Sequence, residues 1–306
     1  MNLTFQILWF EDQTIPTARK NKIQTHLKDK FGLSFVFTQM KGNEELKGED
    51  FNRYDLILMD YSLCQNHTGV QKFKLIREKH SYVDVAFYST TKDDLLDDLS
   101  NLDFEIIEGA YLLDLDNDNL FYDKLFAIIA KIVKRSESIE NLRGIVLNQT
   151  ADFDKNISDL IKKLVEKFSL KKDINTYIES DLQKNLVKSF CKKTINFDNA
   201  SCKFTFCTDK NSSIPYLDSS NSAKLLNTIL YLLVENKQIS KKDFSYTDYL
   251  NEIIHYRNAF AHTCCDNNSI TVKNNTIKIT DELHKCIREI LFKYKVIFDE
   301  LNKIAC

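Results

Sequence analysis

Five short apolar runs in the first half of the chain constrain its fold more than any other feature. They are rich in β-branched and aromatic residues, and segments with helical spacing separate them; they cover residues 5–10, 33–37, 56–59, 83–88 and 110–113. Strands that alternate with helices form a parallel sheet with helices on its faces. The pattern therefore predicts an α/β domain with five parallel strands.

Polar side chains follow three of these runs. Glu11 and Asp12 come after the first run, Asp60 closes the third, and Ser89 and Thr90 follow the fourth. Ligands of open parallel sheets bind beyond the carboxyl ends of the strands, so we expect these side chains to converge in one crevice. Carboxylates and a hydroxyl group suit Mg²⁺ and a phosphoryl group. The plainer interpretation, acidic loops that only keep a flavodoxin-like domain soluble, leaves the register of three strand ends unexplained.

About residues 3–135 resemble the receiver domain of two-component response regulators. ILWFED matches the first strand of that family with its acidic pair, and DLILMD matches the strand that carries the phosphoacceptor. Gly69 corresponds to the turn after that strand, and FYST to the strand that ends in the switch hydroxyl. The resemblance implies a flavodoxin-like fold.

By the same resemblance, Asp60 would be the phosphoacceptor. Glu11 and Asp12 would bind Mg²⁺ together with Asp60, and Ser89 or Thr90 would supply the switch hydroxyl. A histidine-kinase-like ATPase is the partner protein that this arrangement implies.

One residue departs from the receiver pattern. Receivers usually end the fifth strand with a lysine, whereas GAYLLDLD has Asp114 at the expected position. The change removes the cation that pairs with the phosphoacceptor and adds a negative charge. Two interpretations stay open: a degenerate receiver that binds a partner without phosphotransfer, or a site repaired by another lysine such as Lys92.

The string RNAFAH near the C-terminus carries a second kind of chemistry. Arg257 can grip a phosphate through its planar fork, and His262 can move a proton near neutral pH. Apolar residues at helical spacing precede and follow the string, so we expect it at the end of a helix, before a polar turn at 264–268 and a long final helix. A surface arginine and a helix-capping histidine would be the bland interpretation of so short a pattern.

The order of these elements resembles HEPN-domain ribonucleases, whose signature is an arginine followed after four to six residues by a histidine. The resemblance implies metal-independent RNA cleavage, with His262 as general acid or base, Arg257 neutralising charge on phosphorus, and Asn258 contacting the phosphate or orienting the histidine. On an ideal helix Arg257 is rotated roughly 140° from His262. Either the helix ends near His262 or a second copy completes the site, and the family implies a two-fold homodimer.

The sequence thus predicts two domains, receiver-like residues 1–135 and all-helical HEPN-like residues 136–306, joined by a continuous helix around 121–150. Residues 1–130 carry 14 basic and 22 acidic side chains, a net charge of −8, while residues 131–306 carry 28 and 22, a net charge of +6. A basic second half suits a polyanion such as RNA.

The function that these features predict is a regulated, metal-independent RNA endonuclease controlled by a receiver-like sensor. The HEPN resemblance implies a role as a toxin or antiviral defence effector. The alternative is a non-catalytic signalling adaptor whose helical dimer binds RNA or protein. A DNA-binding transcription factor is less well supported, because no helix-turn-helix pattern stands out.

Composition sets the remaining expectations. No run of 18 apolar residues and no signal-peptide pattern occurs, so we expect a soluble, cytoplasmic protein without a membrane partner. The eight cysteines include no CxxC pair and are expected to stay reduced. Cys202, Cys207, Cys264 and Cys265 with His262 match no common zinc-ligand spacing, which argues against a zinc site.

Overall fold

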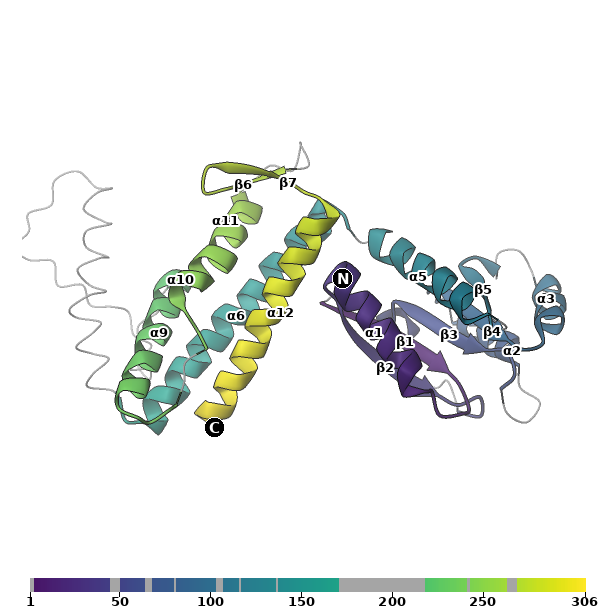
Figure 1. The fold of residues 1–306 in the computed structure, drawn as a ribbon, viewed down its shortest axis with the longest axis horizontal. Coiled ribbons are helices and arrows are strands. Elements are labelled where there is room, and N and C mark those ends of the chain that lie inside the picture. The colour runs from purple at the N-terminus through teal and green to yellow at the C-terminus, as the bar shows by residue number, and fades with distance from the viewer. Residues whose placement is uncertain are drawn as a thin grey trace, which may run out of the picture. The chain divides into compact units, whose positions relative to one another are not determined.

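The computed structural model describes residues 3–44, 50–63, 68–79, 81–102, 107–115, 117–135, 137–170, 218–240, 243–262 and 269–306. The chain divides into two compact units (Figure 1). Unit 1 comprises Met1–Ile145 and Ile279–Glu289, and unit 2 comprises Val146–Lys278 and Ile290–Cys306. The first unit therefore extends past the expected boundary at residue 135 and includes a second, later segment.

Unit 1 contains the predicted five-stranded sheet. The strands are β1 (Thr4–Phe10), β2 (Ser34–Met40), β3 (Leu56–Asp60), β4 (Val85–Ser89) and β5 (Ala110–Asp114). They pair in the order β2-β1-β3-β4-β5, and every pairing is parallel. This is the flavodoxin-like order, so the predicted α/β class and topology are confirmed.

Alternating side chains of the strands fill two separate cores, one on each face of the sheet. Phe5, Ile7 and Trp9 of β1 belong to the core beneath α1 (Thr17–Phe31) and α5 (Asp118–Arg135). Leu8 and Phe10 belong to the core beneath α2 (Gly69–Glu78) and α3 (Lys92–Ser100). The strands read as continuous apolar runs because both faces of the sheet are buried.

The start of α12 (Asp281–Ala305) belongs to unit 1 for identifiable reasons. Arg288 is almost fully buried, and its Nη1 donates to the Phe31 carbonyl oxygen at 3.1 Å and to Glu137 Oε1 at 3.0 Å. Gly32 ends α1 with a φ of +65°, and a Cβ there would lie 2.8 Å from the Lys285 carbonyl oxygen. Only glycine satisfies both the left-handed conformation and this close approach.

The predicted continuous helix over 121–150 is wrong. α5 ends at Arg135 and α6 (Ile139–Lys167) begins four residues later, with Glu137 and Ser138 outside both helices. The Ser138 hydroxyl oxygen accepts a hydrogen bond from the Asn141 backbone N–H at 3.1 Å, as an N-cap does. A serine that caps a new helix thus overrides the apolar periodicity that runs through both segments.

Unit 2 is predominantly helical in the described residues. The later part of α6 packs with α9 (Ser219–Glu235), α10 (Tyr246–Tyr249), α11 (His255–His262) and the later part of α12 (Figure 1). Aromatic rings fill part of its core: Tyr249 contacts Tyr294 edge-on at a centroid distance of 5.1 Å, and Phe153 contacts Phe298 at 5.2 Å. Among the described residues, no helix is long and apolar enough to cross a membrane.

A short β-hairpin follows the motif helix and was not expected from the sequence. β6 (Ser269–Val272) pairs antiparallel with β7 (Asn275–Lys278) across a two-residue turn. Lys273 and Asn274 both have positive φ, 50° and 70°, as the central residues of a type I′ turn do. The polar turn predicted at 264–268 lies outside the described residues.

Candidate functional site

Parallel register brings the acidic residues of unit 1 to one edge of the sheet. Phe10 of β1 is paired with Met59 of β3, and Asp60 with Tyr88 of β4. Glu11 and Asp12 therefore follow β1 at the level where Asp60 closes β3. The expected convergence of the three carboxylates at the carboxyl ends of the strands agrees with this register.

Glu11 is held by hydrogen bonds at both carboxylate oxygens. Its Oε1 accepts from the Gln13 backbone N–H at 3.0 Å, and its Oε2 accepts from the Tyr88 hydroxyl at 2.9 Å. The Tyr88 hydroxyl in turn accepts from Trp9 Nε1 at 2.7 Å. Trp9 and Tyr88 are buried, so this chain of hydrogen bonds fixes Glu11 from within the core. The apolar runs predicted both aromatic residues as part of the core, and they did not indicate the hydrogen bonds of the Trp9 N–H and Tyr88 O–H groups.

Backbone donors hold the other two carboxylates. Asp12 Oδ1 accepts from the Gly42 N–H at 2.8 Å, and Asp60 Oδ1 accepts from the Ser62 N–H at 3.0 Å. Each of these aspartates is partly exposed. The backbone thus orients the acidic side chains without neutralising their charge.

Asp60 is the most electrostatically perturbed of the three. The pKa of its carboxyl is raised to about 6. Burial is the largest cause, and the negative charges of Glu11 and Asp12 act in the same direction, while the Ser62 N–H and the Arg19 guanidinium oppose the rise. Burial and neighbouring negative charges both disfavour the ionised form of a carboxyl group. An aspartate poised near neutral pH by burial and like charge marks a candidate functional site.

Lys92 does not take the place of the lysine that the fifth strand lacks. Its Nζ lies 3.7 Å from Asp114 Oδ2, so the lysine is engaged by the very residue that departs from the receiver pattern. Asp114 is paired in register with Ser89 across β4 and β5. The cation that lowers the pKa of Asp60 is instead Arg19 of α1, which the sequence did not single out.

Ser89 and Thr90 lie at the end of β4, as expected. Ser89 is buried, and its Oγ accepts from the Thr91 backbone N–H at 2.8 Å, whereas Thr90 is exposed. Within the described ranges, no three His, Cys, Asp or Glu side chains are grouped so that they could hold a metal ion. Mg²⁺ binding by Glu11, Asp12 and Asp60 therefore stays a prediction.

Gly69, the first residue of α2, lies directly against Asp60. Its backbone N–H donates to the Tyr61 carbonyl oxygen at 2.8 Å, and a Cβ at Gly69 would lie 2.4 Å from the Asp60 carbonyl oxygen. Backbone atoms cannot yield to such a contact as a flexible side chain does. The glycine expected after the third strand is therefore required by the close approach of the following segment to the acidic residue.

The motif of unit 2 lies in α11, which is described over His255–His262. Asn258 and His262 are exposed, whereas Arg257 is partly buried. His255, Asn258 and His262 share one face at spacings of three and four residues. Arg257 lies on another face, as the predicted rotation of roughly 140° requires.

Charged and buried groups near α11 affect the pKa values of several side chains on or beside it. Burial, followed by the positive charge of Lys273 in the hairpin turn, lowers the pKa of His255. Arg257 acts on two groups of neighbouring helices, Asp154 of α6 and Tyr249 of α10, because it lowers the pKa of each against the effect of burial. The cysteines considered as zinc ligands, Cys202, Cys207, Cys264 and Cys265, lie outside the described residues.

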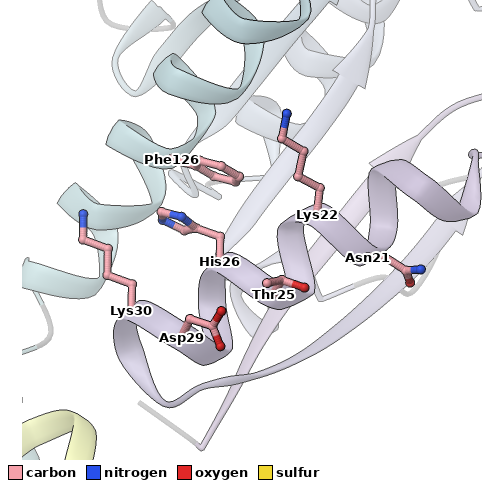
Figure 2. Close-up of a pocket in the computed structure, with 7 residues that line it drawn as sticks. All are labelled: Asn21, Lys22, Thr25, His26, Asp29, Lys30 and Phe126. Carbon is pink, nitrogen blue, oxygen red and sulfur yellow. The ribbon is translucent and has the colours of Figure 1, made fainter.

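Unit 1 also has a surface cavity of about 720 Å³ between α1 and α5. Figure 2 shows that its lining comes from one side of α1 and from one α5 residue: Asn21, Lys22, Thr25, His26, Asp29, Lys30 and Phe126. The rings of His26 and Phe126 stack at a centroid distance of 3.7 Å, and burial lowers the pKa of His26. None of the predicted site residues lines this cavity.

Comparison with known proteins yields structural likeness only. No family model and no curated protein matches the sequence. A LuxR-family DNA-binding response regulator from Staphylococcus aureus is similar over 42% of this chain and 98% of its own, with 16% identity and a TM-score of 0.31. The receiver domain of a Francisella response regulator is similar over 44% and 100%, with 19% identity and a TM-score of 0.29.

A two-component response regulator from Clostridium difficile is similar over 44% of this chain and 100% of its own, with 17% identity and a TM-score of 0.31. These likenesses fall on the N-terminal part of the chain and concern its fold alone. The receiver-like architecture itself is established by the strand order and the parallel register. The helical part has no counterpart among these similar structures.

Proposed function

We propose that the chain is a regulated RNA endonuclease in which the receiver-like unit controls RNA cleavage by the helical unit. The observation that carries the proposal is the placement of Asn258 and His262, which are exposed on one face of α11. Because the His262 side chain is exposed, its imidazole can reach a ribose 2′-OH or a leaving 5′-oxygen without moving the core. The excess of basic side chains in residues 131–306 favours a polyanionic substrate.

In the proposed reaction, His262 removes the proton of the ribose 2′-OH or protonates the leaving 5′-oxygen. The 2′-oxygen forms a bond to phosphorus as the 5′-oxygen leaves, which gives a 2′,3′-cyclic phosphate end and a 5′-hydroxyl end. Arg257 neutralises the charge that builds on the phosphate, and Asn258 hydrogen-bonds the phosphate or orients His262. The reaction needs no metal ion, so cleavage should persist in EDTA.

We further propose that a two-fold dimer completes this site, because Arg257 and His262 of one chain lie on different faces of α11. Mixing inactive Arg257→Ala and His262→Ala chains tests this. If each site takes its arginine and histidine from different chains, random pairing restores about a quarter of the wild-type activity. No recovery after verified exchange of chains, or a fully active monomer by light scattering, contradicts the shared site.

In unit 1 we propose a degenerate receiver that responds to a partner, with a histidine-kinase-like ATPase as the first candidate. The engagement of Lys92 by Asp114 supports this over phosphotransfer. The acidic residues Glu11, Asp12 and Asp60 would bind Mg²⁺ if partner binding draws them together.

A second candidate function is a non-catalytic signalling adaptor whose helical dimer binds RNA or protein. The observation that favours it is that the charge of Arg257 acts on the partly buried Asp154 and the buried Tyr249, while His262 is exposed to solvent. A purified protein that binds RNA and leaves it intact would support the adaptor.

A further inference from the structure

A stripe of polar side chains runs along α11 and the π-helical stretch Leu250–Ile254 that precedes it. At spacings of four, three and four residues, the stripe consists of Asn251, His255, Asn258 and His262. All four side chains are exposed except that of His255, which is partly exposed. At 1.5 Å per residue, the stripe is roughly 17 Å long from its first member to its last. A nucleic-acid strand that reaches one end of this polar stripe therefore extends along it for more than one nucleotide, since the rise per nucleotide in a duplex strand is about 3.4 Å.

The β6–β7 hairpin brings a lysine to the far end of the polar stripe. β6 packs against α11, and Ile270 and Val272 on one face of β6 are buried. In the turn that follows β6, the Lys273 ammonium donates a hydrogen bond to Asn251 Oδ1. The polar stripe thus has an imidazole at its His262 end and an ammonium group at its Asn251 end.

The backbone of the turn does not explain why this residue is a lysine. Lys273 has a φ of +50°, in the left-handed region, where a type I′ turn favours asparagine or glycine. Its side chain is exposed, so burial of apolar surface does not explain the lysine either. What distinguishes lysine from the residues that the turn favours is its positive charge.

This charge is oriented without being neutralised. The hydrogen-bond acceptor, Asn251, is an uncharged amide, and the bond uses one of the three N–H donors of the Lys273 ammonium. The other donors can bind an anion. The charge also acts along the polar stripe: burial, and then the charge of Lys273, lowers the pKa of His255.

We infer that Lys273 binds a phosphate group of the RNA substrate at a distance from the bond that is cut, and that the polar stripe carries the strand from Lys273 to His262. The inference rests on the proposed function for its substrate, and it makes the hairpin turn a substrate-binding element. Lys273 lies at the end of the stripe opposite His262, so it takes no part in proton transfer. A lysine that contacts a phosphate contributes affinity and registers the strand without reading its sequence.

The first test measures binding apart from cleavage. Fluorescence anisotropy gives the Kd of the full-length His262→Ala protein for a labelled, fully 2′-O-methylated RNA of roughly ten nucleotides. Added to this background, Lys273→Asn removes the charge and places a residue that tolerates the left-handed turn. We expect it to raise Kd about threefold to tenfold and to reduce the slope of log Kd against log salt concentration by about 0.7–1. Lys273→Arg, which keeps the charge, should change neither quantity strongly.

Lys237→Asn is the matched control for this measurement. Lys237 is also an exposed lysine with positive φ, +55°, but it follows α9 and lies outside the hairpin. The control should leave Kd and the salt slope unchanged. An unchanged Kd and slope for Lys273→Asn, or an equal loss for Lys237→Asn, overturns the inference.

Cleavage kinetics then separate this inference from the proposed function. In the otherwise wild-type protein, Lys273→Asn should raise KM for the unmodified RNA of the same length by about the factor found for Kd, with kcat changed by less than about twofold. A dinucleotide is too short to span the polar stripe, so both proteins should cut it equally. If the wild type cuts no RNA but Lys273 still governs binding, the proposed function fails and the binding role stands. A lower kcat with unchanged KM, or an equal loss for the dinucleotide, overturns the binding role while cleavage stands.

Discussion

In unit 1 the side chains of the candidate site come from separate strands and meet, whereas in unit 2 the motif side chains come from one helix and diverge. Parallel register places Glu11, Asp12 and Asp60 at one edge of the sheet although almost fifty residues of chain separate them. Helical geometry separates Arg257 from His262 although only four residues intervene. Closeness in sequence is thus a poor guide to closeness in a site, and the architecture decides which residues cooperate.

The two sites also differ in the charge of the ligand that each would bind. The acidic site brings several carboxylates together, while Lys92 is engaged by Asp114, and among the described side chains that act on Asp60 the opposing cation is Arg19. In the helical unit, the partly buried Arg257 carries a positive charge, and that charge lowers the pKa of Asp154. The first site calls for a cation or a cationic partner, and the second for an anion. The following predictions test this contrast, from the largest expected effect to the smallest.

The largest effect is expected for His262→Ala. If His262 transfers protons, its removal lowers RNA cleavage by roughly 10²–10⁴-fold. Folding should be unchanged, because the side chain is exposed. His255→Ala, on the same face of α11, is the matched control in a single-turnover cleavage assay and should retain most of the activity. Equal losses for both histidines would show that the assay reports the integrity of α11 and not proton transfer.

Arg257→Lys should have the next largest effect. The substitution keeps the charge and loses the planar fork that matches a phosphate. We expect a roughly tenfold to hundredfold lower kcat for RNA cleavage, in line with the loss of one preorganised donor group. A lysine variant as active as the wild type would mean that Arg257 is only a surface cation. The helical unit would then have no specific site for an anion.

Asp60→Asn should stabilise unit 1 at neutral pH. The pKa of Asp60, about 6, lies above its unfolded value, so between about pH 4 and 6 the folded state binds more protons and stability falls as pH rises. Above pH 6 the variant should have a free energy of unfolding higher by about 1–2 kcal/mol, after allowance for solvent screening. The difference should vanish near pH 4. Urea titrations at both pH values measure it, with the exposed Asp97→Asn as control; a variant that is less stable at neutral pH would contradict an excess of negative charge.

The smallest effect is expected for phosphoryl transfer to unit 1. Because Lys92 pairs with Asp114, acetyl phosphate should label Asp60 poorly, and Asp60→Ala should change RNA cleavage by less than about twofold. Intact-mass spectrometry after incubation with acetyl phosphate and Mg²⁺ gives the extent of labelling. Asp114→Lys serves as the comparison variant and should increase labelling. Stoichiometric labelling of the wild type at Asp60 would show that this domain accepts a phosphoryl group and is not a degenerate receiver.

The fold of unit 1 could be predicted from the sequence because both faces of the sheet are buried, which makes each strand a continuous apolar run. The pattern located all five strands and placed Glu11, Asp60 and Ser89 at strand ends. It missed Trp9 and Tyr88 as polar participants, since their rings belong to the core and only their N–H and O–H groups reach Glu11. Hydrogen bonds made by the tips of aromatic side chains leave no trace in a hydropathy pattern.

The helical unit was less predictable. The spacing of apolar residues predicted α9, α11 and α12. It also predicted one continuous helix across Ser138, where the structure has the N-cap of a new helix. It did not indicate the π-helical stretch Leu250–Ile254. A single inserted residue changes which face Arg257 occupies, and periodicity averaged over several turns does not register it.

The central claim, that the helical unit cuts RNA with its own side chains, is tested most directly with an RNA that has one ordinary ribose in a 2′-O-methylated strand. The purified wild-type protein in EDTA should cut only after that ribose and leave a 2′,3′-cyclic phosphate, while His262→Ala leaves the strand intact. Binding of the strand without any cleavage, with His262→Ala indistinguishable from the wild type, would contradict the ribonuclease and favour the adaptor.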